Sequence, residues 1–387
     1  MSGLVIVGGG AAGHSCVAAH RDHGGSGPIT LVSADDQLPY FRPHLTKEVL
    51  TGDVPIDEIS LDPVGWYAAH DVEVRLSCRA TGIDIGNRTL ATEAGPISFD
   101  SLVLATGSSA SRLPIPGGDD PRVGTIRTAS DTAAVLDRIE SGDPVLVIGS
   151  GFVGCETAGS LRARGLDVTI ASTEVLPQGE RLGPDAGRLI DGWLRDLGVA
   201  IRPAVRVERI EYGSASARAH LDDGTTVECG WVVMATGATP NLELAKSVGL
   251  VVEDAVPVDA SMRTVAPDVF AVGDIASATN LAAGRPLRVE HWGDAERMGA
   301  IAGSVSAGAE DAWSDVPGFW SSIAGRQLKY TAWGDGWDRA VVRSSAHGVT
   351  IWYGRDGRYV GVLTHEHDDD LEAGTALVRS GAPFDLR

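Results

Sequence analysis

The sequence lacks the features that would place the protein in a membrane or on nucleic acid. Its 387 residues carry 32 Lys and Arg against 52 Asp and Glu, a formal net charge of −20. Such a negative chain is a poor partner for phosphate backbones and anionic lipid surfaces. No apolar run reaches the roughly 18 residues of a membrane span, and the N-terminus shows no cationic signal-peptide segment. We therefore expect a cytoplasmic protein that binds neither membrane nor nucleic acid.

Cysteine is also scarce. The four cysteines, Cys16, Cys78, Cys155 and Cys229, are scattered and form no C-x-x-C pair. Buried free thiols in a reducing cytosol are the expected reading for all four. Cys155 is a partial exception, because it lies at the start of a predicted helix, where a thiol pKa can be lowered.

What the sequence does contain is a strand–glycine–helix unit in its middle. The apolar run Val145–Ile148 predicts a buried strand, and Gly149, Gly151 and Gly154 follow it as G-x-G-x-x-G before a helical pattern. A second strand, Val168–Ile170, closes a βαβ unit. The glycines permit a tight turn, close approach of a diphosphate and close helix packing, and the helix N-terminus favours an anion. This context predicts a dinucleotide site.

The same unit occurs at the N-terminus. The strand Leu4–Val7 leads into Gly8, Gly10 and Gly13, and the return strand is Ile29–Val32. An acid shortly after such a return strand typically holds a ribose hydroxyl, and here Asp35 and Asp36 follow it.

Each copy is followed by a strand that ends in Ala-Thr-Gly. These strands are Leu102–Gly107 and Val232–Gly237. Two matched pairs in matched order indicate an internal duplication. Two dinucleotide sites in one chain suggest that two dinucleotides react with each other.

The length and the motif order predict several domains in an α/β fold. We predict two Rossmann-like domains, one discontinuous over residues 1–110 and 238–307 and the other over residues 111–237. A C-terminal α+β domain is predicted over residues 308–387, which hold five of the nine tryptophans, and core packing explains most of these rings.

The motifs in this order resemble those of FAD-dependent pyridine-nucleotide oxidoreductases of the ferredoxin reductase type. Besides the two glycine motifs, the matching segments are PYFRPHLTK (Pro39–Lys47), LATG, ATGATPN, VFAVGD and RVEHW (Arg288–Trp292). That family includes reductases of bacterial haem-monooxygenase and aromatic-ring dioxygenase systems, with apoptosis-inducing factor as a relative. The resemblance covers the whole chain. It implies that the first glycine motif holds FAD, the second holds NAD(P)H, and the C-terminal domain covers the flavin.

The resemblance also implies site residues. For FAD and the nicotinamide region they are Gly8, Gly10, Gly13, Asp35, Arg42, Lys47, Thr106, Gly107, Arg127, Asp274, Glu290, His291, Trp292 and Trp320. For NAD(P)H they are Gly149, Gly151, Gly154, Glu156, Glu174 and Gly237. The catalytic pair is Lys47 and Glu156, read as an ion pair beside the flavin.

Each of these charged residues has a simpler alternative reading. Glu156 is predicted in the first turn of its helix, where the dipole favours a carboxylate whatever its function, so it is either a cap or the partner of Lys47. Arg42 and Lys47 are either an anion grip or a solvated surface pair.

For the nicotinamide cofactor the sequence favours NADH, with NADPH as the alternative. A 2′-phosphate needs an Arg close after the return strand, but Ser172, Thr173 and Glu174 occupy that place and the first candidate is Arg181.

The resemblance predicts an NAD(P)H-dependent flavoprotein reductase that passes electrons through FAD to a ferredoxin-type iron–sulfur protein, as a monomer or homodimer. One alternative is an NADH oxidase or another FAD-dependent NAD(P)H dehydrogenase with a different acceptor. A second is a redox-sensing interaction protein. A disulfide reductase is the weakest, because residues 33–60 hold no cysteine.

Two charged clusters in the C-terminal domain complete the predictions. Arg326, Lys329, Arg339 and Arg343 form the predicted docking surface for an acidic ferredoxin, and the alternative is ordinary surface charge. The run His365–Asp370, HEHDDD, is predicted to be an acidic solvated loop rather than a metal site.

Overall fold

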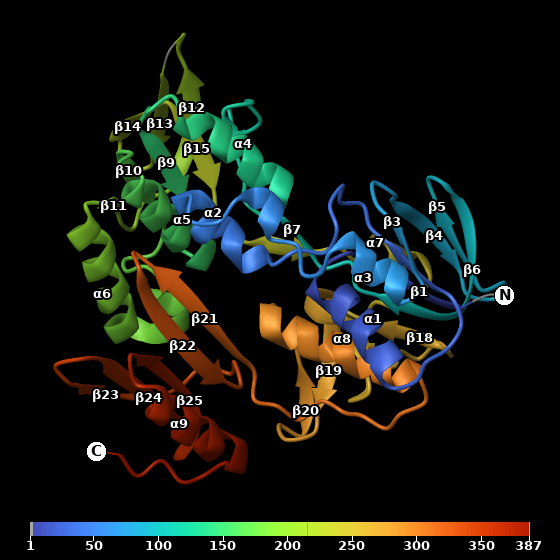
Figure 1. Ribbon diagram of the computed structural model, residues 1–387. Coiled ribbons are helices and arrows are strands. Elements are labelled where there is room, and N and C mark those ends of the chain that lie inside the picture. The colour runs from blue at the N-terminus through green and yellow to red at the C-terminus, as the bar shows by residue number, and fades with distance from the viewer. Residues whose placement is uncertain (1–2, 215, 387) are drawn as a thin grey trace. The chain divides into compact units, whose positions relative to one another are not determined.

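The computed structural model describes residues 3–214 and 216–386, and the chain divides into two compact units (Figure 1). Unit 1 consists of Met1–Phe41, Ser60–Ser109 and Pro240–Phe319. Unit 2 consists of Arg42–Ile59, Ala110–Thr239 and Trp320–Arg387. Residues 42–59 and the C-terminal segment therefore pack with the second glycine motif, and the predicted division into three domains stays a prediction. Among the described residues, no helix is long and apolar enough to cross a membrane.

Unit 1 is built on a seven-stranded sheet with the order β3-β2-β1-β6-β5-β4, and β18 also pairs with β6. The helices and strands of this unit are β1 (Gly3–Val7), α1 (Ala11–Asp22), β2 (Ile29–Val32), α3 (Val64–Ala69), β3 (Val72–Arg75), β4 (Ala80–Asp84), β5 (Thr89–Thr92), β6 (Gly95–Leu104), α7 (Glu243–Ser247), β17 (Val256–Val258), β18 (Val269–Ala271), β19 (Ala276–Asn280), β20 (Arg285–Leu287) and α8 (Trp292–Ser306). The first half of β6 pairs antiparallel with β5, and its second half pairs parallel with β1. The parallel part carries the first glycine motif at the carboxyl end of β1, where α/β sheets bind ligands.

Helix α8 packs closely against α1 because both helices present small residues. A Cβ added at Gly299 would lie 2.1 Å from the carbonyl oxygen of Ala12, and one at Gly303 would lie 2.3 Å from that of Cys16. Neither glycine can carry a side chain without moving a backbone. Helix α8 therefore supports α1, the helix that follows the first motif.

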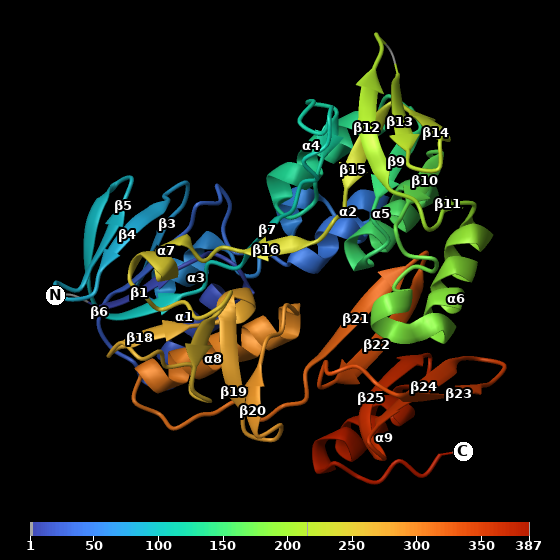
Figure 2. The same ribbon diagram turned by 180° about the vertical axis from the view of Figure 1, so that it is seen from behind.

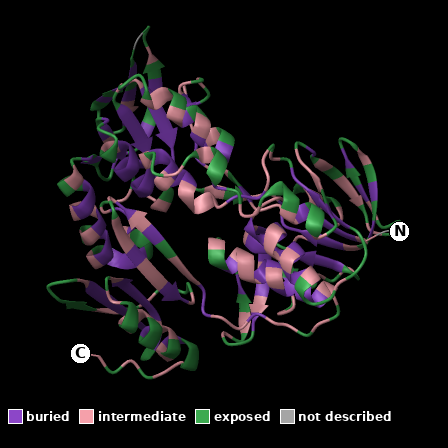
Figure 3. Cartoon of the chain, in the orientation of Figure 1, coloured by how far each residue is buried: buried purple, intermediate pink, exposed green. Residues whose placement is uncertain are grey.

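Unit 2 contains a five-stranded parallel sheet with the order β11-β10-β9-β15-β8. Its elements up to residue 239 are the short 3-10 helix η1 (Arg42–Thr46), α2 (Glu48–Thr51), β8 (Val123–Gly124), α4 (Ala129–Ile139), β9 (Val145–Ile148), α5 (Phe152–Ala163), β10 (Val168–Ala171), α6 (Gly179–Leu197), β11 (Ala200–Arg202), β12 (Val207–Tyr212), β13 (Ala217–Leu221), β14 (Thr226–Cys229) and β15 (Trp231–Met234). Strands β12, β13 and β14 form an antiparallel sheet beside β9 and β15 (Figure 2). Buried residues of both sheets share one apolar core, and β9 and β15 are buried along their whole length (Figure 3).

The C-terminal part of unit 2 is an antiparallel sheet with the order β21-β22-β25-β24-β23 and one helix. Its elements are β21 (Gly318–Ile323), β22 (Arg326–Ala332), β23 (Arg339–Ser344), β24 (Val349–Arg355), β25 (Arg358–His365) and α9 (Asp368–Ser380). Tyr353 is buried and contacts the rings of Tyr330 and Trp337. The predicted fold class, two Rossmann-like domains with a C-terminal α+β part, is confirmed.

Candidate active site

The first glycine of each motif is required by the protein's own packing. Gly8 has φ +126° and Gly149 has φ +105°, values that side chains rarely adopt. A Cβ at Gly8 would lie 2.0 Å from the carbonyl oxygen of Ala105, and one at Gly149 would lie 2.4 Å from that of Ala235. These glycines allow the neighbouring strand to approach the turn.

The third glycine meets the same constraint, and the middle glycine does not. A Cβ at Gly13 would lie 2.0 Å from the Gly8 carbonyl oxygen, and one at Gly154 would lie 2.1 Å from the Gly149 oxygen. At Gly10, in contrast, an added Cβ meets no atom within 4 Å. At Gly151 it meets only the side-chain nitrogen of Gln178, at 3.8 Å. The middle glycine of each motif therefore borders open space.

Each open space lies at the start of a helix that has no anionic cap of its own. Gly10 is the N-cap of α1 and Gly151 that of α5, so neither supplies a side-chain cap, and neither helix has an acid in its first turn. The first amides and the positive end of the dipole are thus left for an external anion. Both sites fit the diphosphate of a dinucleotide.

The Ala-Thr-Gly strand ends are fixed in the same way in both units. In unit 1, the Thr106 hydroxyl donates to the carbonyl oxygen of Asn241 at 2.7 Å, and the Asn241 amide donates to the Thr106 carbonyl oxygen at 2.9 Å. In unit 2, the Thr236 hydroxyl donates to the carbonyl oxygen of Ser111 at 2.7 Å. Gly107 and Gly237 follow with φ +61° and +97°. Each threonine thus ties the end of its strand to a distant segment of the same unit, at Asn241 in unit 1 and at Ser111 in unit 2.

Two predicted acids of unit 1 are held by hydroxyl groups. Asp35, in the turn after β2, accepts a hydrogen bond from Tyr40 at 2.8 Å. Asp274, which follows β18, accepts one from Ser108 at 2.7 Å. Both carboxylates are therefore oriented within unit 1.

The RVEHW segment leads into α8. Glu290 is exposed, and His291 is the N-cap of α8, with its ring nitrogen 3.2 Å from the Asp294 carboxylate. Trp292 packs edge-on against Phe41, with ring centroids 5.2 Å apart, and His291 lies 4.9 Å from Phe319. These residues form two aromatic pairs at the start of α8 in unit 1.

Unit 2 brings Lys47 and Glu156 together. The Lys47 ammonium lies 2.7 Å from Oε2 of Glu156, and the two residues are only 7% and 5% exposed. Thr46 donates to the same oxygen at 2.5 Å, and Ser321 donates to Oε1 at 2.6 Å. Lys47 also donates to the carbonyl oxygen of Pro43 at 3.1 Å. A buried ion pair with its remaining hydrogen bonds satisfied is the arrangement that offsets the desolvation cost.

The predicted place of Glu156 in the first turn is wrong. Helix α5 starts at Phe152, its first turn holds no acid, and Glu156 lies one turn further on. The dipole effect is confined to the first turn, so a helix cap does not explain this carboxylate. Its partners are Lys47, Thr46 and Ser321 instead.

Three further predicted residues lie close to this pair or to each other. The ring of Trp320, 37% exposed, lies 5.0 Å from the Lys47 ammonium, within the range of a cation–π contact. The Arg42 guanidinium donates to the carbonyl oxygen of Arg127 at 2.8 Å. The solvated-surface reading of Lys47 is excluded by its burial.

The region after β10 has a polar, partly buried lining. The hydroxyls of Ser150 and Ser172 lie 2.6 Å apart, and Ser172 accepts from the backbone N–H of Glu174 at 3.1 Å. Oε2 of Glu174 is buried and accepts no hydrogen bond from the described residues. Burial raises the pKa of Glu174, and hydrogen bonds from the backbone N–H groups of Glu180 and Gly179 oppose part of this rise. Oε2 of Glu174 is thus a buried acceptor that lacks a donor among the described residues.

The prediction that Cys155 is a buried free thiol is confirmed, and the lowered thiol pKa considered for its place near the helix start does not occur. Its thiol is fully buried and donates to the carbonyl oxygen of Ser150 at 3.2 Å. Burial raises the pKa of Cys155, and Glu156 and Glu174 add to the effect. Desolvation therefore outweighs any influence of the helix N-terminus, and the thiolate is disfavoured.

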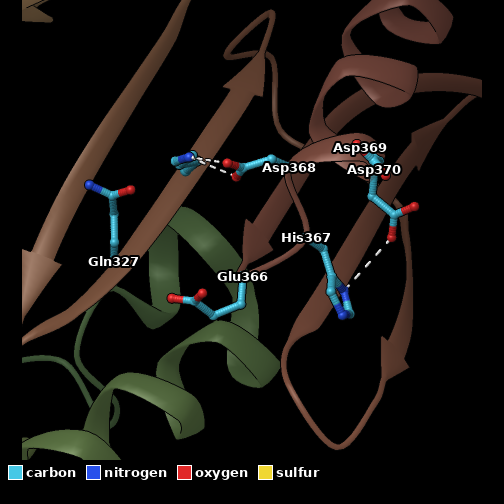
Figure 4. Close-up of a pocket in the computed structure, with 7 residues that line it drawn as sticks. Gln327, Glu366, His367, Asp368, Asp369 and Asp370 are labelled. Atoms are coloured by element: carbon cyan, nitrogen blue, oxygen red, sulfur yellow. Dashed lines mark hydrogen bonds and ion pairs between the residues drawn. The ribbon is translucent and has the colours of Figure 1, made fainter.

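The acidic run near the C-terminus is only partly a loop. His365 ends β25, and Asp368, Asp369 and Asp370 form the first turn of α9, where the dipole stabilises carboxylates. The Nδ1 atom of His367 lies 3.8 Å from Oδ2 of Asp370, and Figure 4 shows the two side chains facing each other. The run borders a cavity of about 650 Å³ whose lining residues are Gln327, Lys329, Glu366, His367, Asp368, Asp369 and Asp370. The described residues contain no His, Cys, Asp and Glu cluster suited to a metal ion.

Three of the four cations in the predicted docking surface already contact a partner within unit 2. Lys329 lies 2.7 Å from Asp368, and Arg326 lies 3.3 Å from Asp196. Arg339 lies over the ring of Phe384 at 5.5 Å. The ion pairs reduce the local positive charge, which weakens the case for this surface.

Sequence reasoning missed Thr46 and Ser321. Thr46 stands inside the PYFRPHLTK segment, next to Lys47, so its position was a usable signal. Ser321 follows Trp320 but is 165 residues from Glu156. No local pattern predicts a contact over that distance.

Comparisons with known proteins agree with these features. The sequence model of the pyridine nucleotide-disulphide oxidoreductase family matches residues 2–299. The biphenyl dioxygenase system ferredoxin–NAD(+) reductase component of Paraburkholderia xenovorans (strain LB400) is 33% identical, over 97% of this chain and 89% of its own length. Rubredoxin–NAD(+) reductase of Pseudomonas putida is 30% identical, over 88% of this chain and 89% of its own. The structure of putidaredoxin reductase in its covalent complex with putidaredoxin matches with a TM-score of 0.93 at 25% identity, covering 99% of this chain and 94% of that one.

Proposed function

The chain belongs to the pyridine nucleotide-disulphide oxidoreductase family, and we propose that it is an FAD-dependent NADH:ferredoxin oxidoreductase. The observation that carries this proposal is the pair of open cradles at Gly10 and Gly151, each at the start of an uncapped helix. Two such cradles suit two dinucleotides, and an enzyme with two dinucleotides transfers electrons between them.

In this proposal the first motif holds FAD and the second holds NADH. Gly8, Gly10 and Gly13 form the FAD diphosphate cradle, with Asp35 for the ribose and Asp274 for the ribityl or diphosphate region. The remaining proposed contacts to FAD or the nicotinamide are Arg42, Thr106, Gly107, Arg127, Glu290, His291, Trp292 and Trp320. When bound, FAD accepts two electrons from NADH and releases them singly to a one-electron acceptor.

The proposed role of Lys47 is to hold a fixed positive charge in a dry environment. Glu156 orients the ammonium at 2.7 Å, and the pair is buried, so solvent does not screen it. Loss of either partner leaves the other charge buried and uncompensated, a cost of about 3–5 kcal/mol. Both residues are therefore needed together.

On the nicotinamide side, Gly149, Gly151, Gly154 and Gly237 form the proposed cradle, and Glu174 accepts from the ribose hydroxyls of NADH. Its unpartnered buried oxygen supports this assignment. A 2′-phosphate would instead face this carboxylate, so NADH is the favoured cofactor and NADPH the poorer one.

The proposed electron acceptor is a ferredoxin-type iron–sulfur protein. The relatives that support it are named as reductases of ferredoxin, of rubredoxin and of putidaredoxin. We propose a cytoplasmic enzyme that acts as a monomer or homodimer.

The test is to supply NADH and compare acceptors. We expect rapid NADH-dependent reduction of a small iron–sulfur protein from an aromatic-ring dioxygenase system, and slow oxygen consumption without it. Oxygen consumption that is equally fast in the absence of any iron–sulfur protein would favour the NADH oxidase alternative.

A further inference from the structure

The two oxygens of the Glu156 carboxylate have separate partners. Oε2 accepts from the Lys47 ammonium at 2.7 Å and from Thr46 at 2.5 Å. Oε1 accepts from Ser321 at 2.6 Å, and no other described residue donates to it. Ser321 therefore fixes the rotation of the carboxylate, and with it the oxygen that faces Lys47.

Water is poorly placed to replace this hydroxyl. Ser321 is 1% exposed and Glu156 is 5% exposed. A buried carboxylate oxygen that loses its donor keeps its desolvation cost, and the side chain then turns to find another donor. The Lys47 ammonium would turn with it.

The close contact depends on a glycine one turn further along α5. A Cβ at Gly159 would lie 2.9 Å from the backbone nitrogen of Ala324, just after β21. This bare position lets the end of β21 approach the face of α5 that carries Glu156. On the same helix, Ser160 donates to the Thr46 carbonyl oxygen at 2.7 Å. Helix α5 thus holds both the strand with Ser321 and the segment with Lys47.

Neighbouring residues of β21 contact both members of the ion pair. Ser321 donates to Glu156, and the ring of Trp320 lies 5.0 Å from the Lys47 ammonium. Strand β21 consequently determines the environment of an ion pair whose two residues come from the segment around Lys47 and from α5.

We propose that Ser321 is a positioning residue, which holds the Glu156 carboxylate so that Lys47 keeps its orientation for flavin reduction. This proposal rests on the proposed function and deepens it. It predicts that loss of the hydroxyl affects the rate of reduction rather than the binding of NADH.

The first experiment uses the purified, flavin-loaded protein and stopped-flow reduction by NADH. Ser321→Ala should lower the limiting rate about tenfold, a barrier change of about 1.4 kcal/mol, with the NADH Kd and the flavin content unchanged. Ser321→Thr, which keeps a hydroxyl, should restore the rate to within about twofold. The matched control is Ser322→Ala, the next residue of β21, which should behave as the unmodified protein. A wild-type limiting rate in Ser321→Ala, or an equal loss in Ser321→Thr, would overturn the proposal.

The second experiment separates this inference from the proposed function. Lys47→Met, Ser321→Ala and the double variant form a cycle in the free energy of urea unfolding of the purified protein. If Ser321 acts through Glu156 on Lys47, the two changes are non-additive in stability, and the double variant is no slower than Lys47→Met in flavin reduction. Additive effects overturn the inference even in an active enzyme. If NADH fails to reduce the flavin of the unmodified protein, the proposed function fails, while the stability cycle still reports the coupling.

Discussion

The two glycine motifs share a backbone and differ in what surrounds them. In each, the first and third glycines are packed against backbone oxygens and the middle glycine borders open space. The residues that follow diverge: His14 and Ser15 come after Gly13, whereas Cys155 and Glu156 come after Gly154. The first helix is braced by α8 through bare glycines, and the second carries the buried acid that binds Lys47. In the proposed function, the shared backbone of the motif serves dinucleotide binding, and the neighbouring side chains serve the chemistry.

The largest effect is expected where the shared backbone is altered. Gly149→Ala places a Cβ at φ +105° and 2.4 Å from the Ala235 carbonyl oxygen. Overpacking and backbone strain together should lower the free energy of unfolding by more than about 3 kcal/mol. Urea unfolding measures it. Gly151→Ala is the control, since that residue has φ −65° and open space, and it should unfold within about 0.5 kcal/mol of the unmodified protein. Equal losses in both variants would contradict the distinction between the two glycines.

The middle glycines should separate the two cofactors. Gly10→Ala fills the first cradle and should yield a folded protein with little bound FAD. Gly151→Ala should keep its FAD and raise the Kd for NADH about tenfold or more, because the new methyl group displaces the diphosphate. A tenfold rise in Kd corresponds to a loss of about 1.4 kcal/mol of binding free energy. Flavin absorbance per chain and NADH titration measure the two effects. If a variant of one motif lost FAD and NADH binding equally, the assignment of one cofactor to each motif would be contradicted.

The acid carried only by the second helix should matter for rate. Lys47→Met leaves Glu156 buried without its countercharge, and we expect the limiting rate of flavin reduction to fall about a hundredfold, or about 2.7 kcal/mol in the barrier. Stopped-flow absorbance at saturating NADH is the measurement. The matched control, Lys246→Met, removes an exposed lysine of unit 1 and should leave the rate unchanged. An unchanged rate in Lys47→Met would reduce Glu156 to a structural acid.

The fold followed from the sequence because its signals are local, and the nucleotide sites remain predictions that rest on the same motifs. A strand, three spaced glycines and a helix lie within about one βαβ unit, and the pairing of Lys47 with Glu156 came with the resemblance. Two predictions failed for identifiable reasons. Glu156 was placed a turn too early in the helix because α5 already starts at Phe152, before the last glycine of the motif. The burial predicted for Cys155, and not its place on the helix, governs the pKa of its thiol. Asp368–Asp370 were assigned to a loop although acids favour a helix start. The contact of Ser321 depends on tertiary packing and leaves no local pattern.

The acids that follow the return strands β2 and β10 also differ in their hydrogen bonds. Asp35 accepts a hydrogen bond from Tyr40, whereas Oε2 of Glu174 lacks a donor among the described residues. Burial raises the pKa of Glu174, so the neutral form is favoured on folding. The resulting stability is present at low pH and is lost as the pH rises through the raised pKa. NADH binding has the opposite sign, since the ionised carboxylate is the better acceptor. We expect the NADH Kd to rise severalfold as the pH falls through that pKa.

The matched variant for this test is Glu174→Gln. Its Kd for NADH at neutral pH should be higher than that of the unmodified protein. This Kd should also be nearly independent of pH, because the amide does not titrate. Isothermal titration of the purified protein over a pH series measures both. A pH dependence that persists in Glu174→Gln assigns it to another group.

The smallest effect is expected at the residue that most suggests thiol chemistry. Cys155 is fully buried, and a serine hydroxyl can donate to the same Ser150 carbonyl oxygen. Cys155→Ser should therefore change NADH-driven dye reduction by less than about twofold, or about 0.4 kcal/mol. A loss of more than about tenfold in the rate of dye reduction would support a mechanism in which the Cys155 thiol takes part in electron transfer.

The most direct test of two reacting dinucleotides is an anaerobic titration of the purified protein with NADH, followed by flavin absorbance. The account predicts a yellow protein with about one flavin per chain, bleached by about one equivalent of NADH. In Gly151→Ala the same bleaching should need a much higher NADH concentration. A protein purified without flavin that does not take up added FAD, or a yellow protein whose colour NADH leaves unchanged, would contradict it.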